Sequence, residues 1–164
     1  MPVVLGRIDL ALLLLARERA HHPRLEVAAR RYSRLGEHSY LWFAIAALGI
    51  AAHRRERPTY LRLGRAVIAA ELSNAALKQL IRRRRPALEG LPALMATNSP
   101  LSYPSAHAST SFAAARVLSA AVPPAAVYAL AAAMALSRPY LGVHYPSDIV
   151  AGAAFGTALA ELVP

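Results

Sequence analysis

Residues 105–136 read SAHASTSFAAARVLSAAVPPAAVYALAAAMAL, and this stretch decides the fold class. It holds two Ala-rich apolar segments, 105–122 and 125–136, separated by Pro123 and Pro124. Proline cannot continue a helix but is tolerated in the first turn of one, so this pair ends one helix and opens the next. The stretch therefore predicts two consecutive helices whose small residues allow close packing.

Similar apolar segments lie on both sides of this pair, over residues 38–53, 61–81 and 149–163. All five segments are shorter than, or barely reach, the roughly 20 residues that a bilayer-spanning helix needs. Residues 8–20, which carry Asp9, and the polar segment 21–37 suit short helices lying in the membrane interface. The sequence thus predicts a single all-α domain over residues 1–164. Residues 1–37 would form interfacial helices, and residues 38–164 a transmembrane bundle of about five helices.

The composition also favours a membrane protein. Hydrophobic residues make up 56% of the chain and charged residues 17%, the formal net charge is +10, and the mean hydropathy is +0.33. Almost all basic residues are Arg and occur in bursts between apolar segments, as expected where cations meet lipid headgroups. One lysine and 7% aromatic residues argue against nucleic-acid binding. We expect a multi-pass protein of the cell membrane, in contact with membrane lipids.

Polar residues gather at the ends of the predicted spans. Counting the spans alternately across the bilayer places eight of them on one side of the membrane: Lys78, Arg85, Ser105, His107, Ser137, Arg138, His144 and Asp148. Polar groups at membrane depth are costly, so their gathering at one end of the bundle indicates a functional site.

The basic residues of this set indicate that the site binds phosphate. Lys78, Arg85 and Arg138 supply three cations, and a guanidinium group matches phosphate oxygens in a bidentate fork. Ser105 and Ala106 stand at the start of a helix, where free backbone N–H groups also favour an anion.

The histidines indicate catalysis on that phosphate. His144 and Asp148 are four residues apart, which lets the carboxylate hold one imidazole nitrogen and leaves the other free and nucleophilic. His107 is then available as a general acid. The same residue types could form half of a zinc site. Three neighbouring cations would repel a divalent metal, however, so we predict no metal and no other cofactor.

Three motifs in this region resemble the signatures of the type-2 phosphatidic acid phosphatase (PAP2) superfamily. The first is Lys78, six residues, then Arg85 and Pro86; the second is the run 104–107, PSAH, where the family normally has Pro-Ser-Gly-His. The third is Ser137 and Arg138 followed by His144 and Asp148 at the usual spacing. The resemblance covers residues 78–148. Its one departure, Ala106 for Gly, is expected to tighten the phosphate pocket slightly.

This resemblance implies an all-helical membrane fold and a metal-independent, two-step reaction. It implies that His144 attacks phosphorus, that Asp148 orients His144, and that His107 protonates the departing alcohol. Water would then hydrolyse the phosphohistidine. The residues that this resemblance assigns to the phosphoryl group are Lys78, Arg85, Ser105, Ala106 and Arg138.

The implied substrate is a lipid phosphate. The short length, the stretch 36–38, GEH, and the block 135–148, ALSRPYLGVHYPSD, look most like actinobacterial members assigned to act on decaprenylphosphoryl-5-phosphoribose in cell-wall arabinan synthesis. Undecaprenyl pyrophosphate, phosphatidylglycerophosphate and phosphatidic acid are alternatives, because the motifs bind the phosphate that all four share. A non-catalytic membrane module that binds anionic lipids or conducts anions is the alternative of another class. Such a module would need the cations but not His107, His144 and Asp148.

Further features lie outside the three motifs. Glu71 and Asn74 share one face of the segment 61–81 with Lys78, so we predict that they line the base of the site and position Lys78. A polar contact between packed helices is the alternative. Gly152 and Gly156 form a GxxxG that would serve packing inside the bundle or a homodimer face. The loop 86–103 is long enough to be a lid over the site.

Overall fold

The computed structural model describes residues 3–19 and 21–164. Within these residues the chain forms seven α-helices and one short 3₁₀ helix, η1: α1 Val3–Glu18, α2 Pro23–Leu35, η1 Glu37–Ser39, α3 Tyr40–Ala52, α4 Arg57–Ile81, α5 Ala106–Leu118, α6 Pro124–Tyr140 and α7 Pro146–Leu162. The described part has no strand and only one isolated bridge, between Arg84 and Leu101, so the predicted all-α class is confirmed. Residues 1, 2 and 20, which belong to the predicted interfacial segment, lie outside the described residues.

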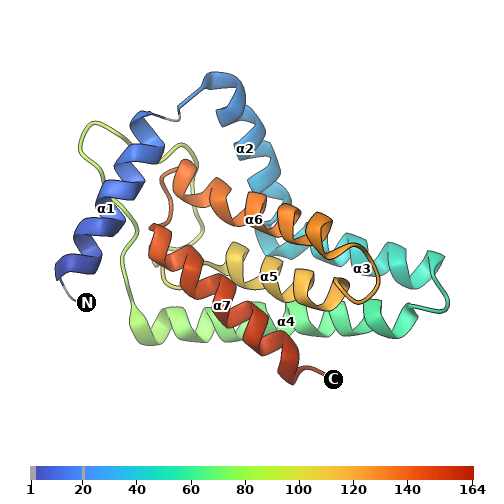
Figure 1. The fold of residues 1–164 in the computed structure, drawn as a ribbon. Coiled ribbons are helices and arrows are strands. Elements are labelled where there is room, and N and C mark those ends of the chain that lie inside the picture. Colours follow the sequence, from blue (N-terminus) through green and yellow to red (C-terminus); the bar gives the residue numbers. More distant parts are fainter. Residues whose placement is uncertain (1–2, 20) are drawn as a thin grey trace.

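Helix α5 is the centre of the bundle (Figure 1). Helices α4, α6 and α7 pack directly around it, α3 packs on α4, and α1 and α2 lie against α6. Most of α5 is buried, and its buried residues are mainly Ala, Ser and Thr. Such small side chains let three neighbouring helices approach one central helix closely.

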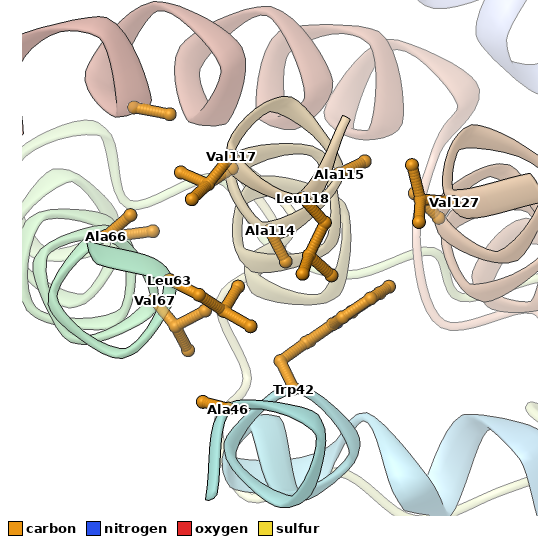
Figure 2. Packing of buried hydrophobic residues seen from close by; sticks show 14 of the residues in the cluster. Trp42, Ala46, Leu63, Ala66, Val67, Ala114, Ala115, Val117, Leu118 and Val127 are labelled. Atoms are coloured by element: carbon orange, nitrogen blue, oxygen red, sulfur yellow. The ribbon is translucent and has the colours of Figure 1, made fainter. Parts of the chain in front are cut away.

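The hydrophobic core lies toward the C-terminal half of α5 (Figure 2). Trp42 of α3 is fully buried there beside Leu63 and Val67 of α4 and Leu118 of α5. The indole N–H of Trp42 donates a hydrogen bond to the hydroxyl of Ser111 over 3.0 Å, so burial of this ring leaves no polar group unpaired. The apolar residues thus pack around the C-terminal half of α5, and the polar residues of the predicted site lie at its N-terminal end.

The two glycines of the GxxxG motif serve packing inside the bundle. A Cβ atom added at Gly152 would lie 2.7 Å from the backbone oxygen of Ser105, and one added at Gly156 would overlap the backbone carbonyl of Ser109. Both glycines therefore let α7 lie against α5. Of the two predicted uses, the structure shows the intramolecular one, and this stripe is not free to form a homodimer face.

Replacement of Gly156 by alanine is expected to destabilise the fold by at least about 1–3 kcal/mol, because a backbone carbonyl must move to admit the new methyl group. The measurement is the thermal midpoint in detergent, followed by the fluorescence of Trp42, the single tryptophan. The matched control is Gly64→Ala in α4, where no atom lies within 4 Å of the added Cβ. Helix propensity should make that control more stable by about 1 kcal/mol. Equal midpoints for Gly156→Ala and wild type would contradict this packing.

The ends of two helices differ from the predicted limits. Helix α6 continues to Tyr140, so Ser137 and Arg138 lie in its last turn and not beyond its end. The helix can include Pro139 near its end because the proline removes only one hydrogen bond there, and the Leu141 N–H still bonds to the Ser137 carbonyl over 2.9 Å. Ser105 is the N-cap of α5 and not a residue of its first turn.

No helix among the described residues is by itself both long and apolar enough to cross a bilayer. Helix α2 and the segment Glu37–Ala52 reach that threshold only when taken together, and the two are bent by 58°. The predicted count of five transmembrane helices, and the division at residue 38, therefore stay predictions.

Candidate active site

A cavity of about 320 Å³ lies at the N-terminal end of α5. Seven of the ten predicted site residues line it: Glu71, Lys78, Arg85, Ala106, His107, Arg138 and His144. These residues come from α4, α5, α6 and the connections that follow α4 and α6. The fold thus brings together in one cavity residues that are widely separated in the sequence.

Arg85 is held in the cavity wall by backbone carbonyls. Its Nε donates to the Ser99 oxygen over 2.7 Å, and its Nη1 donates to the Val143 oxygen over 2.7 Å. Burial lowers the pKa of Arg85 to about 10, so the guanidinium still carries its charge at neutral pH. Lys78 is tethered in the same manner, because its Nζ donates to the Leu101 oxygen over 3.2 Å. Fixed cations of this kind form a binding site for an anion.

Arg138 is almost fully buried and has hydrogen-bonding capacity to spare. Its Nη1 donates to the Ser33 hydroxyl and, over 3.1 Å, to the Met95 sulfur. Within the described residues nothing accepts a hydrogen bond from its Nε. A buried guanidinium N–H without an acceptor is costly. The Arg138 side chain lines the cavity, where its charge favours an anion.

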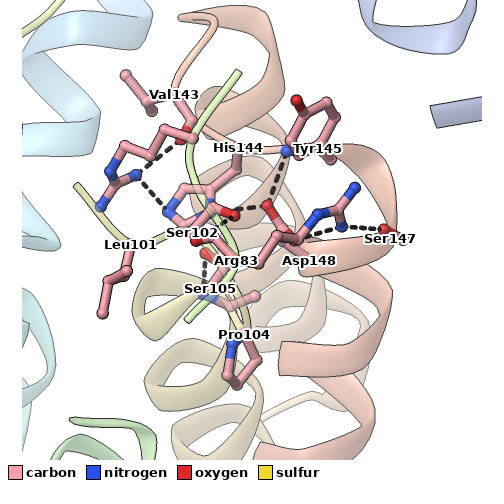
Figure 3. A network of polar contacts seen from close by, with 12 residues as sticks. Arg83, Leu101, Ser102, Pro104, Ser105, Val143, His144, Tyr145, Ser147 and Asp148 are labelled. Atoms are coloured by element: carbon pink, nitrogen blue, oxygen red, sulfur yellow. Dashed lines mark hydrogen bonds and ion pairs between the residues drawn. The ribbon is translucent and has the colours of Figure 1, made fainter. Parts of the chain in front are cut away.

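The hydrogen bonds of His144 fix which of its nitrogens carries the proton (Figure 3). Its Nε2 lies 3.0 Å from Nη1 of Arg85, which can only donate, so Nε2 is the acceptor. The proton is therefore on Nδ1, which lies 3.3 Å from Oδ2 of Asp148. The same oxygen accepts the Tyr145 N–H over 2.9 Å. This arrangement leaves the lone pair of Nε2 facing the cavity cations.

The surroundings of His144 also keep its ring neutral. Burial holds the pKa of His144 well below its usual range, and the positive charge of Arg85 lowers it further. A neutral imidazole with an unprotonated Nε2 has the form that a nucleophile requires. A zinc site needs at least three protein ligands. Among the described residues, no third His, Cys, Asp or Glu is placed to bind a metal together with His144 and Asp148.

His107 bonds to a residue that the sequence motifs do not include. Its Nε2 lies 3.0 Å from the backbone oxygen of Ser33 in α2. A carbonyl only accepts, so this nitrogen carries a proton. Ser33 thus contacts both His107 and, through its hydroxyl, Arg138. Sequence reasoning missed Ser33 because it lies in a segment without a motif, and only the packing of α2 on α6 brings it to the site.

The remaining predicted residues lie beside the cavity rather than in its lining. Asp148 stands behind His144, as described above. The hydroxyl of Ser105 accepts a hydrogen bond from the Ala108 N–H over 3.4 Å and so caps α5. Asn74 is fully buried and donates to the hydroxyl of Ser109 over 3.0 Å. Of the two uses predicted for Asn74, the structure therefore shows a contact between packed helices.

The loop 86–103 contributes Ala96, Thr97, Asn98 and Ser99 to the cavity lining. It is held by hydrogen bonds from the Leu94 N–H to the Leu141 oxygen, over 2.9 Å, and from Arg17 of α1 to the Pro92 oxygen, over 2.7 Å. The predicted lid position thus matches where the loop lies, and α1 helps to hold it.

Comparison with known proteins places the chain among lipid-active phosphatases. A family model described as the PAP2 superfamily matches residues 59–164. The decaprenylphosphoryl-5-phosphoribose phosphatase of Mycolicibacterium smegmatis is 38% identical over 144 residues, which cover 88% of this chain and 80% of that protein. The protein of the same name from Mycobacterium tuberculosis is 38% identical over 141 residues, covering 86% of this chain and 80% of its own length.

Two solved structures are similar in fold. Aquifex aeolicus LpxE has a TM-score of 0.81 and 25% sequence identity, and the match covers 95% of this chain and 94% of that chain. The transmembrane PAP2 type phosphatidylglycerolphosphate phosphatase from Bacillus subtilis has a TM-score of 0.77 and 26% identity, covering 99% and 85% respectively.

Proposed function

This chain belongs to the PAP2 superfamily and is a phosphatase, and we propose that it removes the 5-phosphate of decaprenylphosphoryl-5-phosphoribose in a membrane. The observation that supports this substrate is the 38% identity, over 88% of the chain, to a relative named for that reaction. Since the relatives are phosphatases, the alternative of a non-catalytic lipid-binding or anion-conducting module is not supported.

In the first step, Nε2 of His144 attacks phosphorus, a bond forms between them, and the bond from phosphorus to the ribose oxygen breaks. Before substrate binds, Nη1 of Arg85 donates to that same Nε2 over 3.0 Å. A phosphoryl oxygen is a stronger acceptor for a guanidinium than a neutral imidazole. Bound phosphate therefore draws Arg85 away from Nε2 and frees the lone pair for the attack.

Three cations stabilise the charge that develops on the phosphoryl oxygens. Arg85, Lys78 and Arg138 all line the cavity. Groups that are already in place, with backbone carbonyls holding two of them, need little reorganisation during the reaction. The N–H groups at the start of α5, next to Ala106, add a further site for negative charge.

His107 supplies the proton that the departing ribose hydroxyl needs. In the structure the Ser33 carbonyl accepts the proton on Nε2 of His107. The negative charge of the bound phosphate favours the imidazolium form of His107. The departing oxygen then replaces the Ser33 carbonyl as acceptor and takes the Nε2 proton, which leaves His107 as a neutral imidazole. In the second step a water molecule returns a proton to His107 and attacks phosphorus, the bond to Nε2 of His144 breaks, and inorganic phosphate leaves.

The exposed surface supports a position in the membrane. Large apolar side chains on four helices are 60–70% exposed: Leu48 of α3, Leu72 of α4, Leu136 of α6 and Val150 of α7. Exposed apolar residues of this size are expected where lipid covers the surface. In this proposal α3 to α7 cross the bilayer together, and α1 and α2 lie at its interface. Helix α7 has 17 residues and extends about 25 Å, so the bilayer would be thinned around it.

An apolar groove beside the catalytic cavity supports a lipid substrate. It has a volume of about 370 Å³ and lies between α2 and α6, where Leu25, Tyr32, Leu136 and Tyr140 line it. Tyr32 precedes Ser33, which contacts both His107 and Arg138. The prenyl chain of a substrate whose phosphate is in the cavity would lie in this groove.

A panel of lipid phosphates tests this proposal. Purified protein in detergent should release phosphate from decaprenylphosphoryl-5-phosphoribose with a higher kcat/KM than from phosphatidylglycerophosphate, phosphatidic acid or undecaprenyl pyrophosphate. EDTA should leave the rate unchanged, because the described residues include no group of three or more His, Cys, Asp or Glu side chains arranged to hold a metal ion. A water-soluble phosphoribose without the prenyl chain should be a poorer substrate. A clear preference for one of the other three lipids would contradict the proposed substrate and leave the phosphatase activity standing.

A further inference from the structure

Asp9 is a buried carboxylate in the mostly apolar helix α1, far in sequence from all three motifs. Its Oδ1 accepts the backbone N–H of Ser147 over 2.8 Å, and its Oδ2 accepts the hydroxyl of Ser147 over 2.5 Å and Nη2 of Arg83 over 2.8 Å. Burial by itself raises the pKa of Asp9, but the hydrogen bonds from Ser147 and Arg83 outweigh it, and the net pKa lies below the usual range. Asp9 is therefore ionised at neutral pH.

Arg83 joins this carboxylate to the catalytic one. Figure 3 shows the side of Arg83 that contacts Asp148 and Ser147. One terminal nitrogen, Nη2, donates to Asp9, and the other, Nη1, donates to Oδ1 of Asp148 over 2.8 Å. The guanidinium carbon also lies 4.0 Å from the centre of the Tyr145 ring, which holds the plane of the group. A planar guanidinium can bridge two carboxylates with its separate nitrogens, and an ammonium group cannot do so with the same geometry.

The bridge determines how Asp148 faces His144. Arg83 occupies Oδ1 of Asp148, so Oδ2 is left for Nδ1 of His144. If Asp9 were neutral, Nη2 of Arg83 would lose its ion pair with the Asp9 carboxylate. The guanidinium could then turn away from its present position. Neither Asp9 nor Arg83 lines the catalytic cavity, so neither reaches the phosphate.

We propose that Asp9 and Arg83 are positioning residues, which hold the Asp148 carboxylate and through it set the tautomer and orientation of His144. In consequence α1 is part of the catalytic apparatus, although the three motifs leave it out. This inference rests on the proposed role of His144 as the nucleophile.

Steady-state kinetics of single variants give the first test. Asp9→Asn and Arg83→Gln should each lower kcat by about 10- to 100-fold, the range seen when partners that orient a functional side chain are removed. KM should stay within about twofold, because neither residue reaches the substrate. Arg83→Lys keeps the charge but not the two-sided bridge, so its kcat should fall between those of wild type and Arg83→Gln. The control is Arg84→Gln, whose side chain is exposed in the same arginine run, and its kcat should equal that of wild type.

A double-mutant cycle separates positioning from a merely structural role. If Asp9 acts through Asp148, then Asp9→Asn should have little further effect on kcat once Asp148 is already Asn. A loss by the same factor in both backgrounds would overturn the proposal, because Asp9 would then act independently of Asp148.

A readout that does not depend on turnover keeps this test distinct from the proposed function. In ¹⁵N-histidine spectra of the purified protein, His144 should show the tautomer with its proton on Nδ1, and Asp9→Asn should shift the signal toward a mixture of both tautomers. An unchanged His144 signal in Asp9→Asn would overturn the inference. If wild type and Arg84→Gln released phosphate from no lipid, the proposed function would fail, and the spectra would still decide the roles of Asp9 and Arg83.

Discussion

Replacement of His144 by alanine is expected to lower the rate of phosphate release by on the order of 10⁴-fold or more, because the variant has no atom that can form the covalent intermediate. Nε2 of His144 is the unprotonated imidazole nitrogen that faces the cavity cations, and burial keeps the ring neutral. Alanine leaves Arg85 and Arg138 in place, so substrate should still bind. The measurement is phosphate release by detergent-purified protein, combined with equilibrium binding of the same lipid phosphate.

The intermediate offers a second readout for this prediction. Acid-labile, alkali-stable phosphate should be trapped on wild-type protein quenched during turnover, and none on His144→Ala. The control is His53→Ala, which removes a histidine at the end of α3 that does not line the cavity and should leave the rate unchanged. Equal phosphate release by wild type and His144→Ala would mean that another group is the nucleophile.

The part of the site that could be predicted from sequence is the part that helix ends determine. Lys78, His107, Arg138 and His144 each lie at or near the end of a helix, and alternating helix directions bring such ends to one side of a bundle. The cavity lining includes all four. To predict that these residues lie together, only the ends of the helices had to be known. Those ends are marked in the sequence by Pro104, Pro123, Pro124 and Pro146.

Contacts made by long-range packing could not be predicted in this way. Ser33 and Arg138 form a hydrogen bond although they are 105 residues apart in the sequence, and Asp9 and Ser147 form one over a separation of 138 residues. Neither pair has a local pattern, because each depends on where α1 and α2 dock on the later helices. Asp9 did interrupt an apolar helix, and a carboxylate in such a place needs a partner when it is buried. The cost of burying an unpaired carboxylate was the one sign in the sequence that Asp9 has a partner. It did not identify Arg83 as that partner.

Asn74 shows why a shared helix face did not settle a role. The spacing placed Glu71, Asn74 and Lys78 on one side of α4, and Glu71 and Lys78 do line the cavity. Asn74 lies between them on that face, but α5 covers it, and its amide donates to Ser109 and to the Pro104 carbonyl. Periodicity gives the face of a helix, and only the neighbouring helix decides which residues on that face stay open.

Replacement of Asp148 by asparagine is expected to lower kcat by about 10³- to 10⁴-fold with the fold intact, as when the carboxylate of a His–Asp pair is made neutral in serine proteases. Arg83 can only donate, so it favours the amide oxygen of the new side chain at the position of Oδ1. The amide nitrogen then faces Nδ1 of His144, which stabilises the tautomer with its proton on Nε2. That tautomer has no lone pair directed at phosphorus.

The matched control for Asp148→Asn is Glu161→Gln, which removes a carboxylate from the exposed end of the same helix and should leave kcat unchanged. Thermal midpoints of both variants show whether the fold is retained, and ¹⁵N-histidine spectra report the tautomer directly. A kcat within tenfold of wild type would mean that Asp148 does not set the tautomer of His144. A large loss of kcat without a change of tautomer would point instead to the charge of Asp148, which would then act by stabilising positive charge on the ring as the bond to phosphorus forms.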